Sequence, residues 1–154
     1  FSEEFFPSIN NELPEAKLYI VGKNPTEYIQ SLSSENIVVT GPVESIEQYL
    51  KLANIVVIPL LSGGGVKIKL MEALQYGNIV VSTSKGTEGT QFRDKKEVLI
   101  SDNPNEFSKY CVEALKNPIK YSNMINNAMK CIEENYLWST IGRKYEEFLI
   151  KIIQ

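Results

Sequence analysis

The chain has 154 residues, of which 43% are hydrophobic and 23% charged, and its formal net charge is −3. The length and proportions suit one globular domain with a hydrophobic core. The negative net charge excludes bulk electrostatic attraction to nucleic acid. Histidine is absent, which excludes His-based triads, His metal sites and a His general base. Because no long apolar stretch and no signal-peptide pattern occurs, we expect a cytoplasmic protein without a membrane span. We also expect no metal site.

The first third of the chain alternates helical and extended patterns. Apolar spacing predicts helices over residues 1–13, 25–32 and 45–53. Ser45 and Gln48 have the spacing of a capping box at the start of the third helix. Short apolar runs separate these helices and predict parallel strands that are buried on both faces. The strands are expected at residues 17–21, 37–40 and 55–58.

The next stretch, residues 59–77, carries the strongest functional signal. The apolar strand ends in three consecutive glycines, and a helix is predicted over residues 65–76. Glycines let the backbone approach a ligand closely, and the free amides and dipole of a helix start favour an anion. Lys67 and Lys69 in the predicted first turn add positive charge, so the stretch predicts a phosphate or diphosphate site. A plain surface loop with solvated lysines is the alternative.

Glu72 lies one turn beyond Lys69 in the same predicted helix. Its carboxylate is suited to accept hydrogen bonds from sugar or ribose hydroxyls. The alternative role is an ion pair with Lys69, because side chains three residues apart are neighbours on a helix.

The remaining part of the chain begins with two strands and ends in helices. Strands are expected at residues 79–82 and, more weakly, 98–100, and helices at residues 104–116, 121–135 and 137–153. Asn103, followed by Pro104 and Glu106, predicts a capped helix start. Cys111 and Cys131 lack metal-ligand spacing, and we expect them to be small buried hydrophobic residues rather than a disulfide.

This alternation predicts a single α/β domain with a doubly wound parallel sheet, in which residues 1–118 form the core and residues 119–154 a helical tail. Ligands of such sheets bind beyond the carboxyl ends of the strands. Thr83 and Glu88 follow one strand at that edge and are able to reach a ligand there, although each is equally suited to cap a turn.

Several short motifs occur in a fixed order along nearly the whole chain. They are Leu18-Tyr-Ile-Val-Gly22, Ile37-Val-Val-Thr-Gly41, Tyr49-Leu-Lys-Leu-Ala53, the run from Gly63 to Thr83, Gly86-Thr-Glu-Gly89 and Tyr136-Leu-Trp138. Together they resemble the nucleotide-sugar-binding half of retaining GT-B glycosyltransferases of group 1. The resemblance implies a Rossmann-like donor domain that takes a nucleoside-diphosphate sugar as its substrate and needs no further cofactor.

The resemblance also implies roles for individual residues. Glu72 matches a glutamate that grips the ribose hydroxyls, and Lys69 resembles the residue that faces the diphosphate. Many members carry a second glutamate eight residues before Glu72, where this chain has Gly64; glycine-rich members with a basic residue at the position of Lys67 form a recognisable variant. The implied catalytic residues are Lys67, Lys69 and Glu72, and the implied donor-binding residues are Gly41, Pro42, Val43, Gly63, Gly64, Gly65, Val66, Thr83 and Glu88.

The implied reaction moves a sugar, of the hexosyl type, from a nucleoside diphosphate to a saccharide or lipid-linked acceptor. GT-B enzymes work in a cleft between two domains, so the implied partner is an N-terminal acceptor-binding domain. We expect the isolated chain to bind a donor weakly and to transfer little. Peripheral membrane association of the full enzyme stays open, and a non-catalytic nucleotide-binding or flavodoxin-like module is the alternative function.

One expectation concerns the sheet itself. The family's donor domain begins with a strand that precedes the helix at residues 1–13 and separates the strands at residues 17–21 and 55–58. We therefore expect the chain to be a fragment of a longer two-domain enzyme. We also expect those two strands either to pair directly or to have a foreign segment between them.

Overall fold

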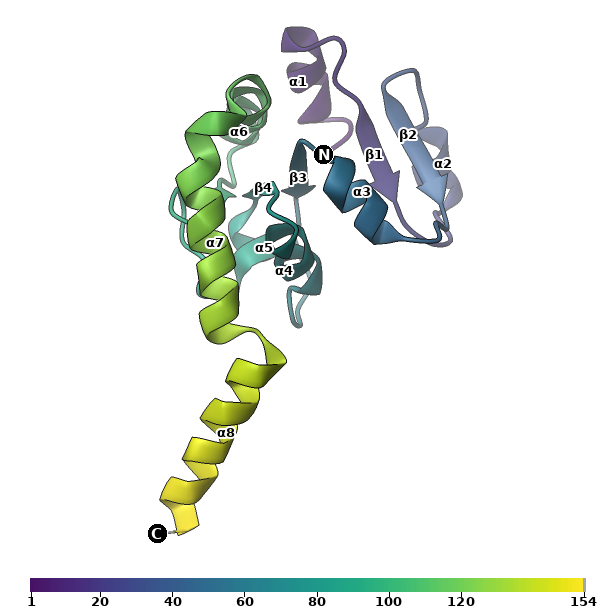
Figure 1. The fold of residues 1–154 in the computed structure, drawn as a ribbon. Helices are drawn as coiled ribbons and strands as arrows, with labels where there is room; N and C mark the ends of the chain where they lie inside the picture. Colours follow the sequence, from purple (N-terminus) through teal and green to yellow (C-terminus); the bar gives the residue numbers. More distant parts are fainter. Residues whose placement is uncertain (154) are drawn as a thin grey trace.

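The structure, a computed structural model, describes residues 1–153 and has five short parallel strands in two sheets (Figure 1). The strands lie within one residue of their predicted bounds at each end. They are β1 (Leu18–Val21), β2 (Ile37–Gly41), β3 (Ile55–Ile58), β4 (Ile79–Ser82) and β5 (Leu99–Ile100). Strands β1 and β2 are set to one side of β3 and β4 (Figure 1).

The helices follow the strands as predicted, and the doubly wound α/β fold with a helical tail is confirmed. They are α1 (Phe6–Glu12), α2 (Glu27–Ser31), α3 (Ile46–Leu52), α4 (Ile68–Gln75), α5 (Ser84–Thr87), α6 (Pro104–Lys116), the 3₁₀ turn η1 (Pro118–Tyr121), α7 (Ser122–Asn135) and α8 (Trp138–Ile153). The Asn103 side chain accepts hydrogen bonds from the backbone N–H groups of Asn105 and Glu106, which confirms the predicted cap of α6.

Strand β4 shows why Ile79, Val80 and Val81 are all apolar. Ile79 and Val81 point into a core cluster with α1 and α6, whereas Val80 points into a second cluster with α4 and α7. All four residues of β4 are buried. Because alternate side chains of a strand leave opposite faces, a strand covered by helices on both sides takes apolar residues on both faces. The polar Ser82 at its end is also buried, and its hydroxyl donates a hydrogen bond to the carbonyl of Ile58.

Three local predictions were wrong. Helix α1 begins at Phe6 rather than Phe1, because residues 2–5 form a turn before it. Helix α4 begins at Ile68 rather than Gly65, because Gly65 has a φ of +85° and Lys67 is not helical. The Ser45 side chain makes no capping hydrogen bond to α3, so the predicted capping box does not form.

Of the two outcomes expected for the sheet, direct pairing of β1 with β3 does not occur. Within residues 1–153, β1 pairs only with β2, and β3 belongs to a separate sheet with the order β3-β4-β5. The two strands therefore do not pair directly within the described residues. Residues of both, Leu18, Ile55 and Val57, nevertheless pack against one core cluster.

Helix α8 projects away from the rest of the domain (Figure 1). Its apolar side chains do not pack on either sheet; Trp138 is 87% exposed and Phe148 is 57% exposed. In the part of the chain that the structure describes, no helix has the length and apolar character that crossing a membrane requires.

Candidate functional site

The glycine-rich loop between β3 and α4 is exposed at the carboxyl end of β3. Gly63 and Gly65 have φ angles of +110° and +85°, a region that side chains other than glycine rarely adopt. The loop is exposed, and Val66 at its end is 75% exposed. Among the described residues, the backbone N–H groups of residues 63–67 donate no hydrogen bond to the protein. These N–H groups are therefore free to donate hydrogen bonds to a ligand.

The two predicted lysines differ in their surroundings. Lys67 is the residue before the first turn of α4 and is only 7% exposed, whereas Lys69 lies in that turn and is exposed. The carbonyl of Lys67 accepts hydrogen bonds from the N–H groups of Leu70 and Met71, at 3.0 and 3.1 Å, which fixes the start of the helix. Both lysines thus lie at the junction of the glycine loop and α4.

Glu72 is exposed one turn further along α4. It forms no ion pair with Lys69 in the described part of the chain. The alternative role for this carboxylate is therefore not realised, and its oxygens stay open to solvent and to a ligand.

Lys67, Lys85 and Glu88 form a charged cluster next to the glycine loop. The ammonium of Lys85 donates a hydrogen bond to Oε2 of Glu88 at 2.6 Å. That hydrogen bond and the charge of Lys85, with a smaller effect from Lys67, hold the pKa of Glu88 below its ordinary value. The sequence interpretation missed Lys85, although its position three residues before Glu88 on a helical turn was a usable signal.

Thr83 connects the loops after β3 and β4. Its hydroxyl donates to the carbonyl oxygen of Leu60 at 2.5 Å and accepts from the N–H of Gly86 at 3.2 Å. The side chain is 1% exposed and caps α5. Of the two roles that the sequence allowed, the structure shows the cap, and this hydroxyl holds the glycine loop rather than facing a ligand.

The loop after β2 borders a separate open pocket of about 510 Å³. Gly41 and Pro42 line it, and Val43 does not. Gly41 has a φ of +67°, which glycine adopts at little cost. The sequence interpretation missed Asn24 and Thr40, which also line this pocket, although Asn24 lies in the loop that begins at Gly22, directly after β1, and so carried a positional signal.

The two predicted parts of the site lie on different sheets. Gly41 ends β2 in the first sheet, and the glycine-rich loop follows β3 in the second. The pocket at Gly41 contains no residue of the glycine-rich loop, so the structure does not join them into one cavity. A further concavity of about 310 Å³, lined by residues 116–120, contains none of the predicted site residues. The described residues include no group of three or more metal-ligating His, Cys, Asp or Glu side chains.

Two solved structures have this fold. TarM superposes with a TM-score of 0.74 and 19% sequence identity, over 90% of this chain and 30% of TarM. The C-terminal domain of the glycosyl transferase group 1 family protein LpcC from Francisella tularensis superposes with a TM-score of 0.71 and 11% identity, over 89% of this chain and 80% of that domain. At these identities the two structures establish the fold alone.

Sequence comparison gives the family. A protein from the cps region of Klebsiella pneumoniae, of 44.6 kDa, is 30% identical over 139 residues, which cover 84% of this chain and 36% of that protein. The chain thus spans about a third of the length of this relative. The family model described as glycosyl transferases group 1 matches residues 1–117, and the chain therefore belongs to that family.

Proposed function

We propose that this chain is the donor-binding half of a glycosyltransferase. The full enzyme moves a sugar, of the hexosyl type, from a nucleoside diphosphate to a saccharide or lipid-linked acceptor. Family membership supports the general reaction. The observation that carries the assignment of the site is the row of free backbone N–H groups at residues 63–67, which ends at Lys67 and lies two residues before Lys69.

The glycine-rich loop is the place where the diphosphate binds. Its amides donate to the phosphate oxygens, and Lys69 adds a charge-assisted hydrogen bond from the first turn of α4. Lys67 contributes positive charge from a largely buried position. As the bond between sugar and diphosphate breaks, negative charge grows on the leaving phosphate, and these fixed donors stabilise it.

The other parts of the donor are assigned by position. Glu72, with its open carboxylate, accepts hydrogen bonds from the ribose hydroxyls. The pocket bordered by Gly41 and Pro42 receives the base. Glu88 forms an ion pair with Lys85 next to the glycine-rich loop. We assign its carboxylate to a contact with the donor sugar.

Exposed apolar side chains around the glycine-rich loop indicate that a second domain covers this side of the site. Leu61 is 80% exposed and Ile68 is 59% exposed, next to the exposed Val66. Apolar side chains grouped around a polar loop are typical of a surface that another domain covers. We assign this surface to an acceptor-binding domain of the full enzyme, so residues 1–154 alone bind the donor weakly and transfer little sugar.

Calorimetric titration of the intact protein with UDP, GDP, ADP and dTDP, and then with their sugars, tests the proposed function. One base is expected to give a saturable heat, and its nucleotide sugar is expected to be consumed when saccharide acceptors are added. If no nucleoside diphosphate binds at millimolar concentration, the proposal fails. If one binds but no acceptor is ever glycosylated, the chain is a nucleotide-binding module instead.

A further inference from the structure

The side chain of Lys67 is largely buried, yet its ammonium has no partner among residues 1–153. Lys67 is 7% exposed, and it forms no ion pair there. Every hydrogen bond that a lysine ammonium donates in this part of the chain comes from another lysine. No fully buried side-chain nitrogen of the described residues lacks a partner, so the Nζ atom of Lys67 keeps contact with solvent while its stem is buried.

Glu88 is the carboxylate on which this ammonium acts. The charge of Lys67 lowers the pKa of Glu88, in addition to the larger effect of Lys85. Glu88 nevertheless forms its ion pair with Lys85, at 2.6 Å, and forms none with Lys67 in the described chain. One carboxylate is therefore attracted by two ammonium groups and pairs with only one of them.

The short helix α5, which carries Lys85, is anchored on two sides. Thr83 caps its start and donates a hydrogen bond to the carbonyl of Leu60 in the loop after β3. Ser84 donates two hydrogen bonds, from its N–H and its Oγ, to the carboxylate of Asp102. The backbone of Lys85 therefore has a fixed position relative to the loop from which the glycine-rich stretch departs.

Removing the charge of Lys85 leaves Glu88 with one remaining ammonium that lowers its pKa, that of Lys67. The side chain of Glu88 is 57% exposed, so it has room to change its rotamer. Because opposite charges attract more strongly in a partly buried site than in water, the carboxylate is expected to turn toward Lys67. Such an ion pair would neutralise the positive charge of Lys67 and occupy its hydrogen-bond donors.

We propose that Lys85 is a positioning residue of the diphosphate site, which holds Glu88 away from Lys67 and so keeps the Lys67 ammonium available for phosphate oxygens. Lys85 acts through Glu88 and does not itself touch the donor. The three side chains together carry one positive charge, and the ion pair of Lys85 with Glu88 decides that this charge lies on Lys67. The inference rests on the proposed function, because it concerns the same diphosphate.

Two other roles for Lys85 are distinguishable from positioning. The first is a surface ion pair without function, such as that of Lys51 with Glu47 on α3. The second is direct contact between Lys85 and the diphosphate. In a direct contact, loss of Lys85 weakens binding whether or not residue 88 is charged. In the positioning role, the loss matters only while Glu88 carries its charge.

Calorimetric titration of the intact protein with UDP, GDP, ADP and dTDP measures this difference, and these nucleotides lack the sugar to which Glu88 is assigned. Lys85→Gln is expected to raise the Kd of the nucleotide that binds by about 10-fold, because the Lys67 ammonium is then occupied. Lys85→Arg is expected to bind like the wild type, because it keeps the ion pair.

Two further variants isolate the role of Glu88. Lys85→Gln combined with Glu88→Gln is expected to bind as tightly as Glu88→Gln alone. Lys51→Gln breaks the ion pair on α3 and is expected to leave Kd unchanged. The inference is overturned if Lys85→Gln binds like the wild type. It is also overturned if the double variant binds more weakly than Glu88→Gln, because Lys85 then contacts the diphosphate directly.

A measurement without nucleotide separates this inference from the proposed function. Carbon NMR of the Glu88 carboxyl is expected to show a pKa that stays below its ordinary value in Lys85→Gln, because Lys67 takes the place of Lys85. Adding Lys67→Met is expected to return the pKa to its ordinary value. A return in Lys85→Gln alone contradicts the positioning role, even where nucleotides bind. If no nucleotide binds the wild type, the proposed function fails, and the NMR titration still decides whether Lys85 keeps Glu88 from Lys67.

Discussion

The hydroxyl of Thr83 donates a hydrogen bond to the backbone carbonyl of Leu60 at 2.5 Å, and this bond joins the loop after β4 to the loop after β3. The same hydroxyl accepts from the N–H of Gly86. One buried side chain thus starts α5 and anchors the strand end from which the glycine-rich loop departs. The position of the candidate diphosphate site depends on this connection.

Replacing Thr83 with valine is expected to lower the free energy of unfolding by about 1 to 3 kcal/mol, because the carbonyl of Leu60 and the N–H of Gly86 lose a buried partner. Thr83→Ser is the matched control, because it keeps the hydroxyl. Urea unfolding of the two variants measures the difference. A valine variant as stable as the serine variant would show that the hydrogen bonds contribute nothing.

Gly86→Ala is expected to destabilise the protein by about 1 to 3 kcal/mol through overpacking. An added Cβ would lie 2.2 Å from Oγ of Ser82 and 2.9 Å from the carbonyl oxygen of Ile58. Gly22→Ala is the control, because no atom lies within 4 Å of its added Cβ and its φ is not positive. Thermal unfolding compares the two, and equal melting temperatures would contradict the close contact at Gly86.

Asp102 contributes stability that depends on pH. Its carboxylate accepts hydrogen bonds from Oγ and N–H of Ser84, at 2.6 and 2.8 Å, and these bonds lower the pKa of Asp102. A lowered pKa means that the contribution is complete above the unfolded-state pKa of about 3.9 and is lost as the pH falls through the folded-state pKa.

The comparison of wild type with Asp102→Asn tests this contribution. The wild type is expected to be the more stable protein at pH 7, and the difference in unfolding free energy is expected to shrink below about pH 4. Measuring the difference between the two proteins removes the titration of the other carboxylates. A difference that stays constant from pH 7 to pH 3 would contradict the role of Asp102.

Several parts of the fold were predictable because local patterns determine them. Strands β3 and β4 were predicted with the bounds that the structure shows, since short runs rich in Ile and Val between helical segments favour buried strands. The start of α4 was not predicted correctly, because apolar spacing does not reveal that Gly65 takes a positive φ. Helix α5 was missed because four residues are too few to show a helical period.

The candidate site was predictable in part for a similar reason. The glycine-rich loop and Lys69 are contiguous in sequence, so their proximity follows from the chain. The ion pair of Lys85 with Glu88 and the burial of Thr83 depend on how the loops after β3 and β4 pack, which sequence spacing does not reveal. The division into two sheets depends on contacts between strands that are distant in the sequence, and the apolar pattern does not predict such contacts.

Lys69→Ala and Glu72→Ala are each expected to weaken nucleotide-sugar binding without changing the melting temperature, because both side chains are exposed at the start of α4. Each lost charge-assisted hydrogen bond is expected to raise Kd by about 10- to 150-fold, which corresponds to about 1.5 to 3 kcal/mol. Calorimetric titration of the intact protein measures the effect.

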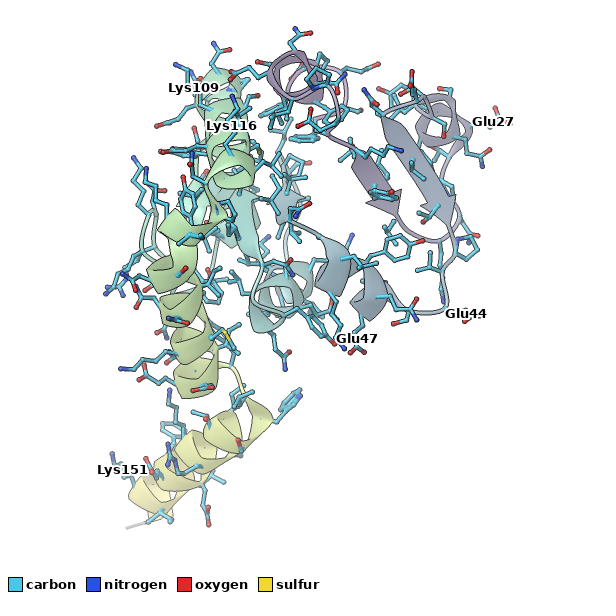
Figure 2. The ribbon with its side chains drawn as sticks, turned by 45° about the horizontal axis from the view of Figure 1, so that its top comes forward. Glu27, Glu44, Glu47, Lys109, Lys116 and Lys151 are labelled. Carbon is cyan, nitrogen blue, oxygen red and sulfur yellow. The ribbon has the colours of Figure 1, made fainter. Side chains whose placement is uncertain are left out.

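Matched controls remove the same charges elsewhere. Figure 2 shows Lys109 on α6, a helix that carries none of the predicted site residues, and Glu147 lies on the projecting helix α8. Lys109→Ala and Glu147→Ala are expected to leave Kd unchanged. If Lys69→Ala and Glu72→Ala bind as tightly as these controls, the assignment of both residues is wrong.

The central claim is that the glycine-rich loop binds the diphosphate of a nucleotide-sugar donor. A crystal structure of the intact protein with its preferred nucleoside diphosphate tests it most directly. We expect phosphate oxygens within hydrogen-bond distance, about 2.7 to 3.2 Å, of backbone N–H groups in residues 63–67, with Nζ of Lys69 against the same diphosphate. A diphosphate bound elsewhere, with the glycine-rich loop in contact with solvent alone, would contradict the claim.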